Sequence, residues 1–251
     1  RRQTLQCKAV LIAAALLLAP SWVAAGAQER PRLVLQITVD ALRGDLPGRS
    51  AHLFGDGGFR YLMDQGVHYT NAHYQHANTE TIVGHVSLAT GTVPAAHGMV
   101  GNVWFDRDLI HAKGLDQAEV EQAVAGELVK FDGVAAAVSS TALRTASLPD
   151  TALLRAILKN FHPKRSGDIY VVFEPNVFIT DFDGLTVAST HGSPWRYDTF
   201  VPVMFAGAGL EPRTLSRPIT PYDVAPTLAN VLGVKPPSGA IGIPLTEVVG
   251  N

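Results

Sequence analysis

Cysteine is almost absent from the sequence, which has a single one, Cys7, among its 251 residues. A lone cysteine cannot form an intramolecular disulfide, and it cannot supply the several thiolates that structural zinc sites use. Any metal ion that the chain binds is therefore expected to use oxygen and nitrogen ligands.

An excess of charge of one sign is also lacking. Twenty Lys and Arg residues stand against 22 Asp and Glu residues, which gives a formal net charge of −2. Without a basic stripe or a block of like charges, nucleic acid and anionic membrane surfaces are not expected as main partners.

Several common enzyme signatures are missing as well. The sequence has no P-loop and no Gly-x-Ser-x-Gly elbow, so it lacks the signatures of P-loop NTPases and of common α/β-hydrolases. The stretch AGAGLEP (206–212) lacks the third glycine of a dinucleotide fingerprint, and we interpret it as a turn. The spacing of Asp181 and Asp183 does not single them out as an acid–base couple.

The chain does carry one long apolar run, and it lies at the N-terminal end. The basic start RRQTLQCK is followed by AVLIAAALLLAPSWVAA and then by the small residues of 25–27. This order is typical of a secretory signal peptide, 1–27, that is cleaved after Ala27. The alternative is an uncleaved membrane anchor, but Pro20 and the small-residue end favour cleavage. We expect a periplasmic or secreted protein without membrane contact after cleavage.

The remaining 28–251 are expected to form a single domain, because 47% hydrophobic residues are enough for one substantial core. Short apolar or alternating runs predict strands, and runs with apolar residues at helical spacing predict helices. Their alternation predicts an α/β fold, an αβα sandwich with a mainly parallel central sheet covered on both faces. Strands are expected at 32–39, 67–74, 134–139, 168–174 and 200–207, and helices at 50–65, 82–90, 116–131, 149–160 and 222–232.

Three polar residues occupy places where chemistry is common in such folds. Asp40 follows the predicted strand 32–39, Thr81 precedes the predicted helix 82–90, and His191 follows the strand-like LTVAST. Strand ends of α/β sheets gather ligand-binding groups, and helix N-termini favour anions. Each residue also has a structural interpretation: a turn or helix cap for Asp40, an N-cap for Thr81, a loop residue for His191.

A hydroxyl such as that of Thr81 must lose its proton before it can attack a phosphoryl group. No base adjoins it in the sequence, so a divalent metal ion held by Asp40 and a distant histidine is the expected activator.

Several motifs in this order resemble those of one family. VDALRGD, NTETIVGHVSLATGTVPAAHGMVGNVWFD, HPKRSGDIYVVFEPNVF, THGSPWRYDTFVPVMFAGAGL and PYDVAPTLANVLGV look like the alkaline phosphatase superfamily. The most similar branch contains bacterial periplasmic phosphatases with a threonine nucleophile, which are related to type I phosphodiesterase/nucleotide pyrophosphatases. The resemblance covers two blocks, 32–108 and 114–249.

The resemblance implies roles for four residues. Asp40 would be a metal ligand, Thr81 the nucleophile and a metal ligand, Asn102 a donor to a phosphoryl oxygen, and His191 a ligand of a second metal. It also implies two Zn²⁺ ions, a phosphothreonine intermediate, a small phosphate ester as substrate, and a monomer.

Other attractive residues fall on positions that the family uses structurally. These are His85 and His97, and Asp223 at the start of a helix.

Parts of the family pattern do not occur between the two blocks. Members carry there an Asp followed four residues on by a His, an adjacent Asp-His pair and a Lys-x-Arg substrate clamp. Here the two blocks adjoin almost directly, which favours an internal deletion or an error in the gene model over gradual divergence. The expected function is thus a metal-dependent phosphatase acting through Thr81. The alternatives are a catalytically inactive, truncated exported member and a phosphodiesterase or nucleotide pyrophosphatase.

Overall fold

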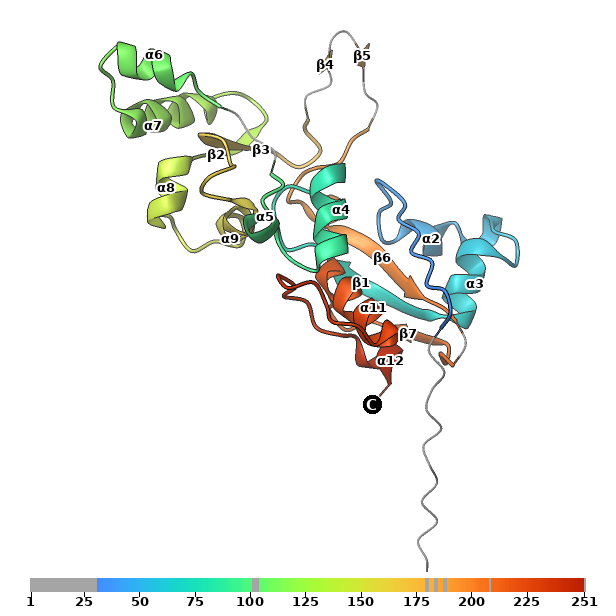
Figure 1. The fold of residues 1–251 in the computed structure, drawn as a ribbon. Coiled ribbons are helices and arrows are strands. Elements are labelled where there is room, and N and C mark those ends of the chain that lie inside the picture. The colour runs from blue at the N-terminus through green and yellow to red at the C-terminus, as the bar shows by residue number, and fades with distance from the viewer. Residues whose placement is uncertain are drawn as a thin grey trace, which may run out of the picture. The chain divides into compact units, whose positions relative to one another are not determined.

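The computed structural model describes residues 31–100, 104–178, 181–182, 185–186, 189–207 and 209–250 (Figure 1). The predicted signal peptide, 1–27, lies outside these residues. Helices and strands are interspersed along the described chain, with several helices in succession between some of the strands. The helices are α2 (Leu46–Arg49), η1 (Ala51–Leu53), α3 (Gly58–Gln65), α4 (Thr81–Thr90), α5 (Pro94–His97), α6 (Arg107–Ala112), α7 (Gln117–Leu128), α8 (Ser140–Thr145), α9 (Ala152–Asn160), α10 (Arg196–Thr199), η2 (Pro221–Asp223), α11 (Val224–Leu232) and α12 (Thr246–Val249).

The strands form three small sheets. Strand β1 (Val67–His73) lies between β6 (Phe200–Phe205) and β7 (Arg213–Leu215); β2 (Val134–Ser139) pairs with β3 (Ile169–Phe173), and β4 (Asp181–Phe182) with β5 (Leu185–Thr186). The α/β class is confirmed. The expectation of a mainly parallel sheet is not met among the described strands, because only β1 and β7 pair in parallel. Strands β1 and β6 are separated by more than a hundred residues, so no short crossover fixes their relative direction.

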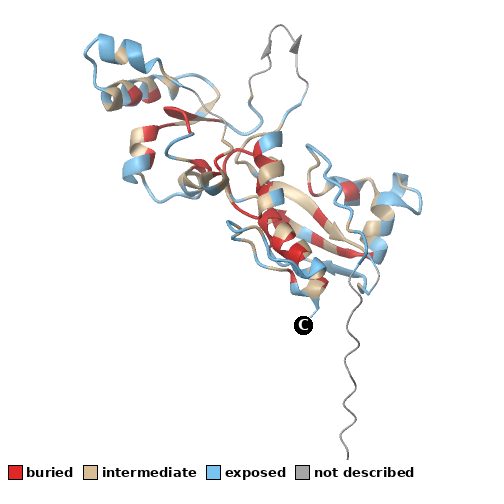
Figure 2. Ribbon diagram, in the orientation of Figure 1, coloured by how far each residue is buried: buried red, intermediate tan, exposed pale blue. Residues whose placement is uncertain are grey.

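The first hydrophobic core lies on the three-stranded sheet. Strand β1 buries Val67, Tyr69 and Ala72 completely, and its register shifts between Tyr69 and Ala72. These residues pack with Val224 of α11 and Val248 of α12, which cover one side of the sheet (Figure 2). The half-buried strand expected at 67–74 is therefore present as 67–73, but its alternation holds only over the first residues and shifts at the irregularity.

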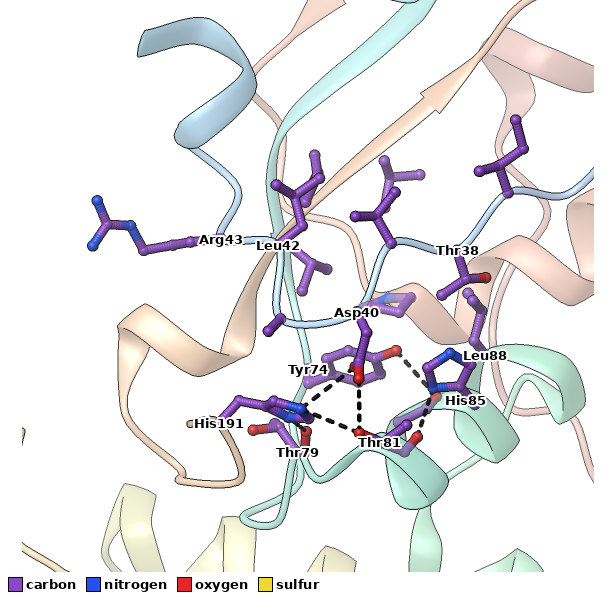
Figure 3. Close-up of a pocket in the computed structure, with 18 of the residues that line it drawn as sticks. Thr38, Asp40, Leu42, Arg43, Tyr74, Thr79, Thr81, His85, Leu88 and His191 are labelled. Atoms are coloured by element: carbon purple, nitrogen blue, oxygen red, sulfur yellow. Dashed lines mark hydrogen bonds and ion pairs between the residues drawn. The ribbon is translucent and has the colours of Figure 1, made fainter. Parts of the chain in front are cut away.

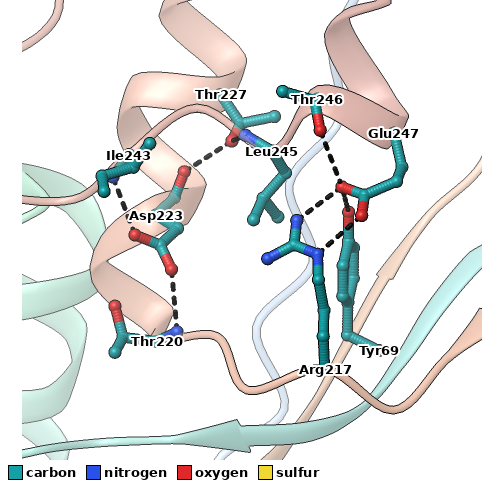
Figure 4. A network of polar contacts seen from close by, with 9 residues as sticks. All are labelled: Tyr69, Arg217, Thr220, Asp223, Thr227, Ile243, Leu245, Thr246 and Glu247. Atoms are coloured by element: carbon teal, nitrogen blue, oxygen red, sulfur yellow. Dashed lines mark hydrogen bonds and ion pairs between the residues drawn. The ribbon is translucent and has the colours of Figure 1, made fainter.

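A polar network fastens α11 to the segment that leads into α12 (Figure 4). Asp223 accepts hydrogen bonds from the backbone N–H groups of Thr220 and Ile243, each at 2.8 Å. Thr227, fully buried, accepts one from the N–H of Leu245 at 2.9 Å. Asp223 is thus a helix-start residue, as the sequence suggested.

A second core surrounds the β2–β3 pair. Val138 and Val172 of these strands pack with Ile157 and Phe161 from α9 and the residue after it. Helix α9 begins at the Thr151 cap, whose hydroxyl accepts from Leu154 N–H, and it presents its apolar face to the pair. The predicted strands 134–139 and 168–174 and the predicted helix 149–160 are thus all present.

The predicted strand 32–39 is not formed. The segment is extended, but none of its backbone groups is paired with another strand among the described residues. Leu33, Leu35 and Ile37 are 80%, 75% and 72% exposed. The prediction failed because an apolar, β-branched run shows that a strand can form, whereas pairing also needs a neighbour in register.

The predicted helix 50–65 is interrupted. It consists of η1 and α3, separated by a short loop that ends at Gly57, and Gly58 adopts a φ of +58°. Helix 82–90 begins one residue earlier than expected and ends at Gly91, whose φ of +66° gives a left-handed cap. Within the described ranges no helix combines the length and the apolar character that crossing a membrane requires.

Candidate active site

The hydroxyl of Thr81 lies at the first residue of helix α4. The N-cap position is occupied by Glu80, so Thr81 is not the cap, and its Oγ1 donates instead to Asp40 Oδ2 at 2.9 Å. The same Oγ1 lies 3.2 Å from Nε2 of His191. Asp40 and His191, which lie 41 and 110 positions from Thr81 in the sequence, therefore both contact its hydroxyl (Figure 3).

Asp40 reaches this point from the end of the extended segment. The chain turns directly afterwards at Ala41, whose φ of +55° is uncommon for a residue with a side chain. The hydrogen bond from Gly44 N–H to Phe200 O, at 2.9 Å, fixes the turn to the start of β6. The Asp40 carboxylate is half exposed, and its Oδ1 lies 3.4 Å from His191 Nε2.

His191 is oriented by a backbone carbonyl. Its Nδ1 lies 2.7 Å from the oxygen of Thr79, an atom that can only accept, so Nδ1 carries the proton. In the neutral ring Nε2 then has a lone pair that faces Thr81 and Asp40. The side chain is about 20% exposed, so the ring is largely enclosed.

The loop that carries His191 is held close to the chain before Thr81. Thr79 Oγ1 donates to the carbonyl of Ser193 at 3.2 Å. Gly192, the residue before Ser193, has a φ of +124°, and a Cβ at this position would lie 3.1 Å from Glu80 Cγ. This close approach requires glycine, since any side chain would strain the backbone and push Glu80 away.

Two further histidines interact with helix α4 itself. Nδ1 of His85 lies 2.6 Å from the carbonyl oxygen of Thr81, one turn earlier in the helix. Nε2 of His97 lies 2.9 Å from Ser87 Oγ, and partial burial lowers the pKa of His97. The first contact lies within α4 and the second joins α4 to α5; the structural roles expected for these two histidines stay predictions.

Sequence reasoning missed the supports of the site. The Thr79 carbonyl group could not be recognised from the sequence, because every residue has a backbone carbonyl group. Tyr74, which donates to the carbonyl of Gly84 at 3.1 Å and whose pKa is raised by burial, was also not singled out. Asn102 lies outside the described residues, so its expected contact with a phosphoryl oxygen stays a prediction.

The donor atoms of Asp40, Thr81 and His191 fit one metal ion. Their separations are 2.9, 3.2 and 3.4 Å, and tetrahedral zinc with bonds of about 2.1 Å places neighbouring ligands about 3.4 Å apart. A carboxylate, a hydroxyl and an imidazole form a nitrogen–oxygen set that suits zinc. This set contains only two residues of the usual ligand types, Asp40 and His191, and the described part of the chain has no group of three or more His, Cys, Asp or Glu that could hold a metal ion.

Comparison with known proteins gives consistent results. Residues 34–143 match the family described as type I phosphodiesterase / nucleotide pyrophosphatase. A protein of Myroides odoratus described as a calcium-transporting ATPase is 35% identical over 147 residues, which are 59% of this chain and 26% of that protein. Alkaline phosphatase PhoV of Synechococcus elongatus is 31% identical over 147 residues, with the same coverage of each chain.

The fold agrees with the sequence matches. The crystal structure of wild-type alkaline phosphatase PafA superimposes with a TM-score of 0.52 at 28% identity, over 67% of this chain and 32% of that one. The matched part of this chain thus spans about a quarter of the length of these curated relatives. Shared sequence and shared fold support the alkaline phosphatase superfamily as the family that this chain resembles.

Proposed function

We propose that the protein is a metal-dependent phosphoric ester hydrolase in which Thr81 is the nucleophile. One observation carries this proposal: the Thr81 hydroxyl, at a helix N-terminus, lies within 3.2 Å of both a carboxylate and an imidazole nitrogen from distant parts of the chain. Capping alone would not need either partner. The alkaline phosphatase relatives support the same chemistry.

The chain's own residues have distinct tasks in this reaction. Thr81 Oγ1 loses its proton and forms a bond to phosphorus while the bond from phosphorus to the leaving oxygen breaks, and the leaving alcohol takes up a proton. The first-turn N–H groups of α4 lack intrahelical acceptors and face the incoming anion. Water then cleaves the phosphothreonine, which releases phosphate and restores the hydroxyl. Asn102 is proposed to donate to a phosphoryl oxygen.

Asp40, Thr81 and His191 are proposed to hold zinc. When bound, zinc would supply Lewis-acid chemistry that lowers the pKa of the Thr81 hydroxyl and neutralises developing charge. The Thr79 carbonyl keeps the His191 ring in the tautomer whose Nε2 can act as a ligand.

Release of nitrophenol from nitrophenyl phosphate, measured with added zinc, tests the proposal. Thr81→Ala should abolish turnover, whereas Thr81→Ser, which keeps a hydroxyl, should retain part of it. Mass spectrometry after acid quenching should find the phosphoryl group on the peptide that contains Thr81. Unchanged turnover in Thr81→Ala would rule out this nucleophile.

Two other functions each have an observation in their favour. The described residues contain no group of three or more His, Cys, Asp or Glu that could hold a metal ion, which favours a catalytically inactive, truncated family member. Such a protein would unfold cooperatively but would not retain zinc at micromolar concentration.

The matched family description favours a phosphodiesterase or nucleotide pyrophosphatase. Faster hydrolysis of bis-nitrophenyl phosphate than of nitrophenyl phosphate would identify that activity.

Export to the periplasm and a monomeric state are part of the proposal. They rest on the signal-like 1–27 and on the resemblance. N-terminal sequencing of the protein recovered from the periplasmic fraction should begin at Gln28. Light scattering should give the mass of one chain.

A further inference from the structure

A cavity of about 780 Å³ opens beside the candidate site. Volumes of this order are typical of small-molecule binding sites. Asp40, Thr81 and His191 all contribute to its lining, so the cavity and the proposed reaction centre are continuous.

The wall opposite these polar groups is apolar throughout. It is formed by residues of α3, β6, α11 and the start of η2, and every one of them is Phe, Leu, Val, Met or Pro. The charged and imidazole groups of the lining belong instead to the segments around 40–43, 80–85 and 191–198. The cavity therefore has a polar part, where the N-terminus of α4 and the proposed metal ion would receive an anion beside the carboxylates, and an apolar wall whose side chains offer no partner to a hydroxyl or a charge.

The apolar wall is incompletely covered. Leu88 of α4 and Leu228 of α11 line the cavity and pack on the first core, yet each is only partly buried. Leu35 and Ile37 line it from the extended segment and remain 75% and 72% exposed. A ligand that covers these side chains would remove apolar surface from water.

Helix α4 connects the two parts. Thr81, His85 and Leu88 are spaced by four and three residues, so they share one face of the helix. With a rise of about 1.5 Å per residue, Thr81 and Leu88 are about 10 Å apart along the axis. In Figure 3, Leu88 follows His85 along the helix while Asp40 and His191 stay at the Thr81 end.

We infer that this cavity binds the apolar group of a phosphate ester whose phosphoryl group lies at Thr81. The preferred substrates are then monoesters of apolar alcohols, such as alkyl phosphates, rather than phosphates of polyhydroxylated alcohols. This inference rests on the proposed function for the placement of the phosphoryl group.

Calorimetric titration of Thr81→Ala protein with butyl, hexyl and octyl phosphate, below their micellar concentrations, tests the inference without requiring turnover. This variant lacks the proposed nucleophile but keeps the apolar wall. Affinity should increase with chain length by up to about fourfold for each added methylene. Glycerol phosphate should bind more weakly than butyl phosphate.

Ile37→Asn and Leu33→Asn in the Thr81→Ala background form a matched pair. Both residues are exposed and belong to the same extended segment, but only Ile37 lines the cavity. The chain-length dependence should decrease in Ile37→Asn and stay unchanged in Leu33→Asn. Equal effects of the two substitutions, or equal binding of butyl and octyl phosphate, would overturn the inference.

The two proposals can fail separately. If turnover of nitrophenyl phosphate depends on Thr81 but alkyl length does not affect the affinity for alkyl phosphates, the inferred role of the cavity is wrong and the proposed function is still supported. If affinity depends on alkyl chain length but the protein does not turn over nitrophenyl phosphate, binding of an apolar group in the cavity is supported and the proposed hydrolase function is contradicted.

Discussion

The Nδ1 atom of His191 lies 2.7 Å from the carbonyl oxygen of Thr79, two residues before the proposed nucleophile. This contact couples the loop of His191 to the chain that enters helix α4. It also assigns the proton to Nδ1, so that Nε2 is free to face Thr81 and Asp40. The geometry of the candidate site therefore depends on one backbone atom as well as on three side chains.

Replacement of His191 should weaken both zinc binding and turnover. In His191→Gln the site loses a proposed ligand, and we expect zinc affinity and kcat/KM to fall by at least about 10- to 100-fold, which is the usual loss even for residues that only support a metal ligand. Chelator competition and nitrophenyl phosphate hydrolysis measure the two quantities. His162→Gln, at a histidine outside the cavity, is the control. Full affinity in His191→Gln would contradict the assignment.

Zinc should stabilise the folded chain through Asp40. A ligand present at about 100 times its Kd, and bound only by the folded state, contributes about 2.7 kcal/mol. Thermal unfolding should therefore show a higher Tm with zinc than with a chelator. Asp40→Asn should remove this difference, whereas Asp56→Asn, at an exposed loop carboxylate, should keep it. A zinc-dependent Tm in Asp40→Asn would show that the ion binds elsewhere.

Thr227 should be important for stability through its buried hydroxyl (Figure 4). In Thr227→Val the shape is kept, but the N–H of Leu245 loses its acceptor in a buried environment. We expect the free energy of unfolding in urea to fall by about 1–3 kcal/mol. Thr246→Val, an exposed position next to Leu245, should change it by less than about 0.5 kcal/mol. Similar values for the two variants would argue against the network.

The Glu247 carboxylate should make stability depend on pH in the acid range. Arg217, whose Nε donates to Glu247 Oε1 at 2.6 Å, lowers the pKa of Glu247 to about 2, with a smaller contribution from the Tyr69 hydroxyl. Because the folded pKa is below the unfolded one, this contribution is complete above about pH 4.5 and is lost as the pH falls toward 2.

The Arg217→Gln variant isolates this contribution. The difference in unfolding free energy between wild type and Arg217→Gln should shrink as the pH decreases from 4.5 to 2. Urea denaturation at several pH values measures it, and Arg213→Gln, an exposed position on β7, is the control. A difference that stays constant with pH would refute the pairing.

Local features were predicted well from the sequence where local physics decides them. Helix α4 could be placed because a short apolar run ends at Gly91, and β1 because the sequence that begins at Val67 alternates between apolar and polar residues. The proximity of Asp40 and Thr81 was also anticipated, from the metal ion that the hydroxyl would need and from the family resemblance, although the strand expected to lead to Asp40 is not formed. The roles of these residues and the domain limits remain predictions.

Non-local features could not be predicted in the same way. Whether 32–39 becomes a paired strand depends on a neighbour elsewhere in the chain, and whether β6 runs antiparallel to β1 depends on the path between them. The position of the His191 ring depends on a carbonyl group, which no residue type reveals. Each of these features is set by tertiary contacts between segments far apart in the chain.

The backbone of the extended segment 32–39, which pairs with no strand among the described residues, affects how the protein can be handled. A run of β-branched and aliphatic residues with unsatisfied amide groups is a template onto which identical strands of other molecules can stack. Its exposed leucines and isoleucine would lie on the resulting surface. Recovery after expression should consequently decline with protein concentration, and a lysine at position 33, as a charged gatekeeper, should counter that loss.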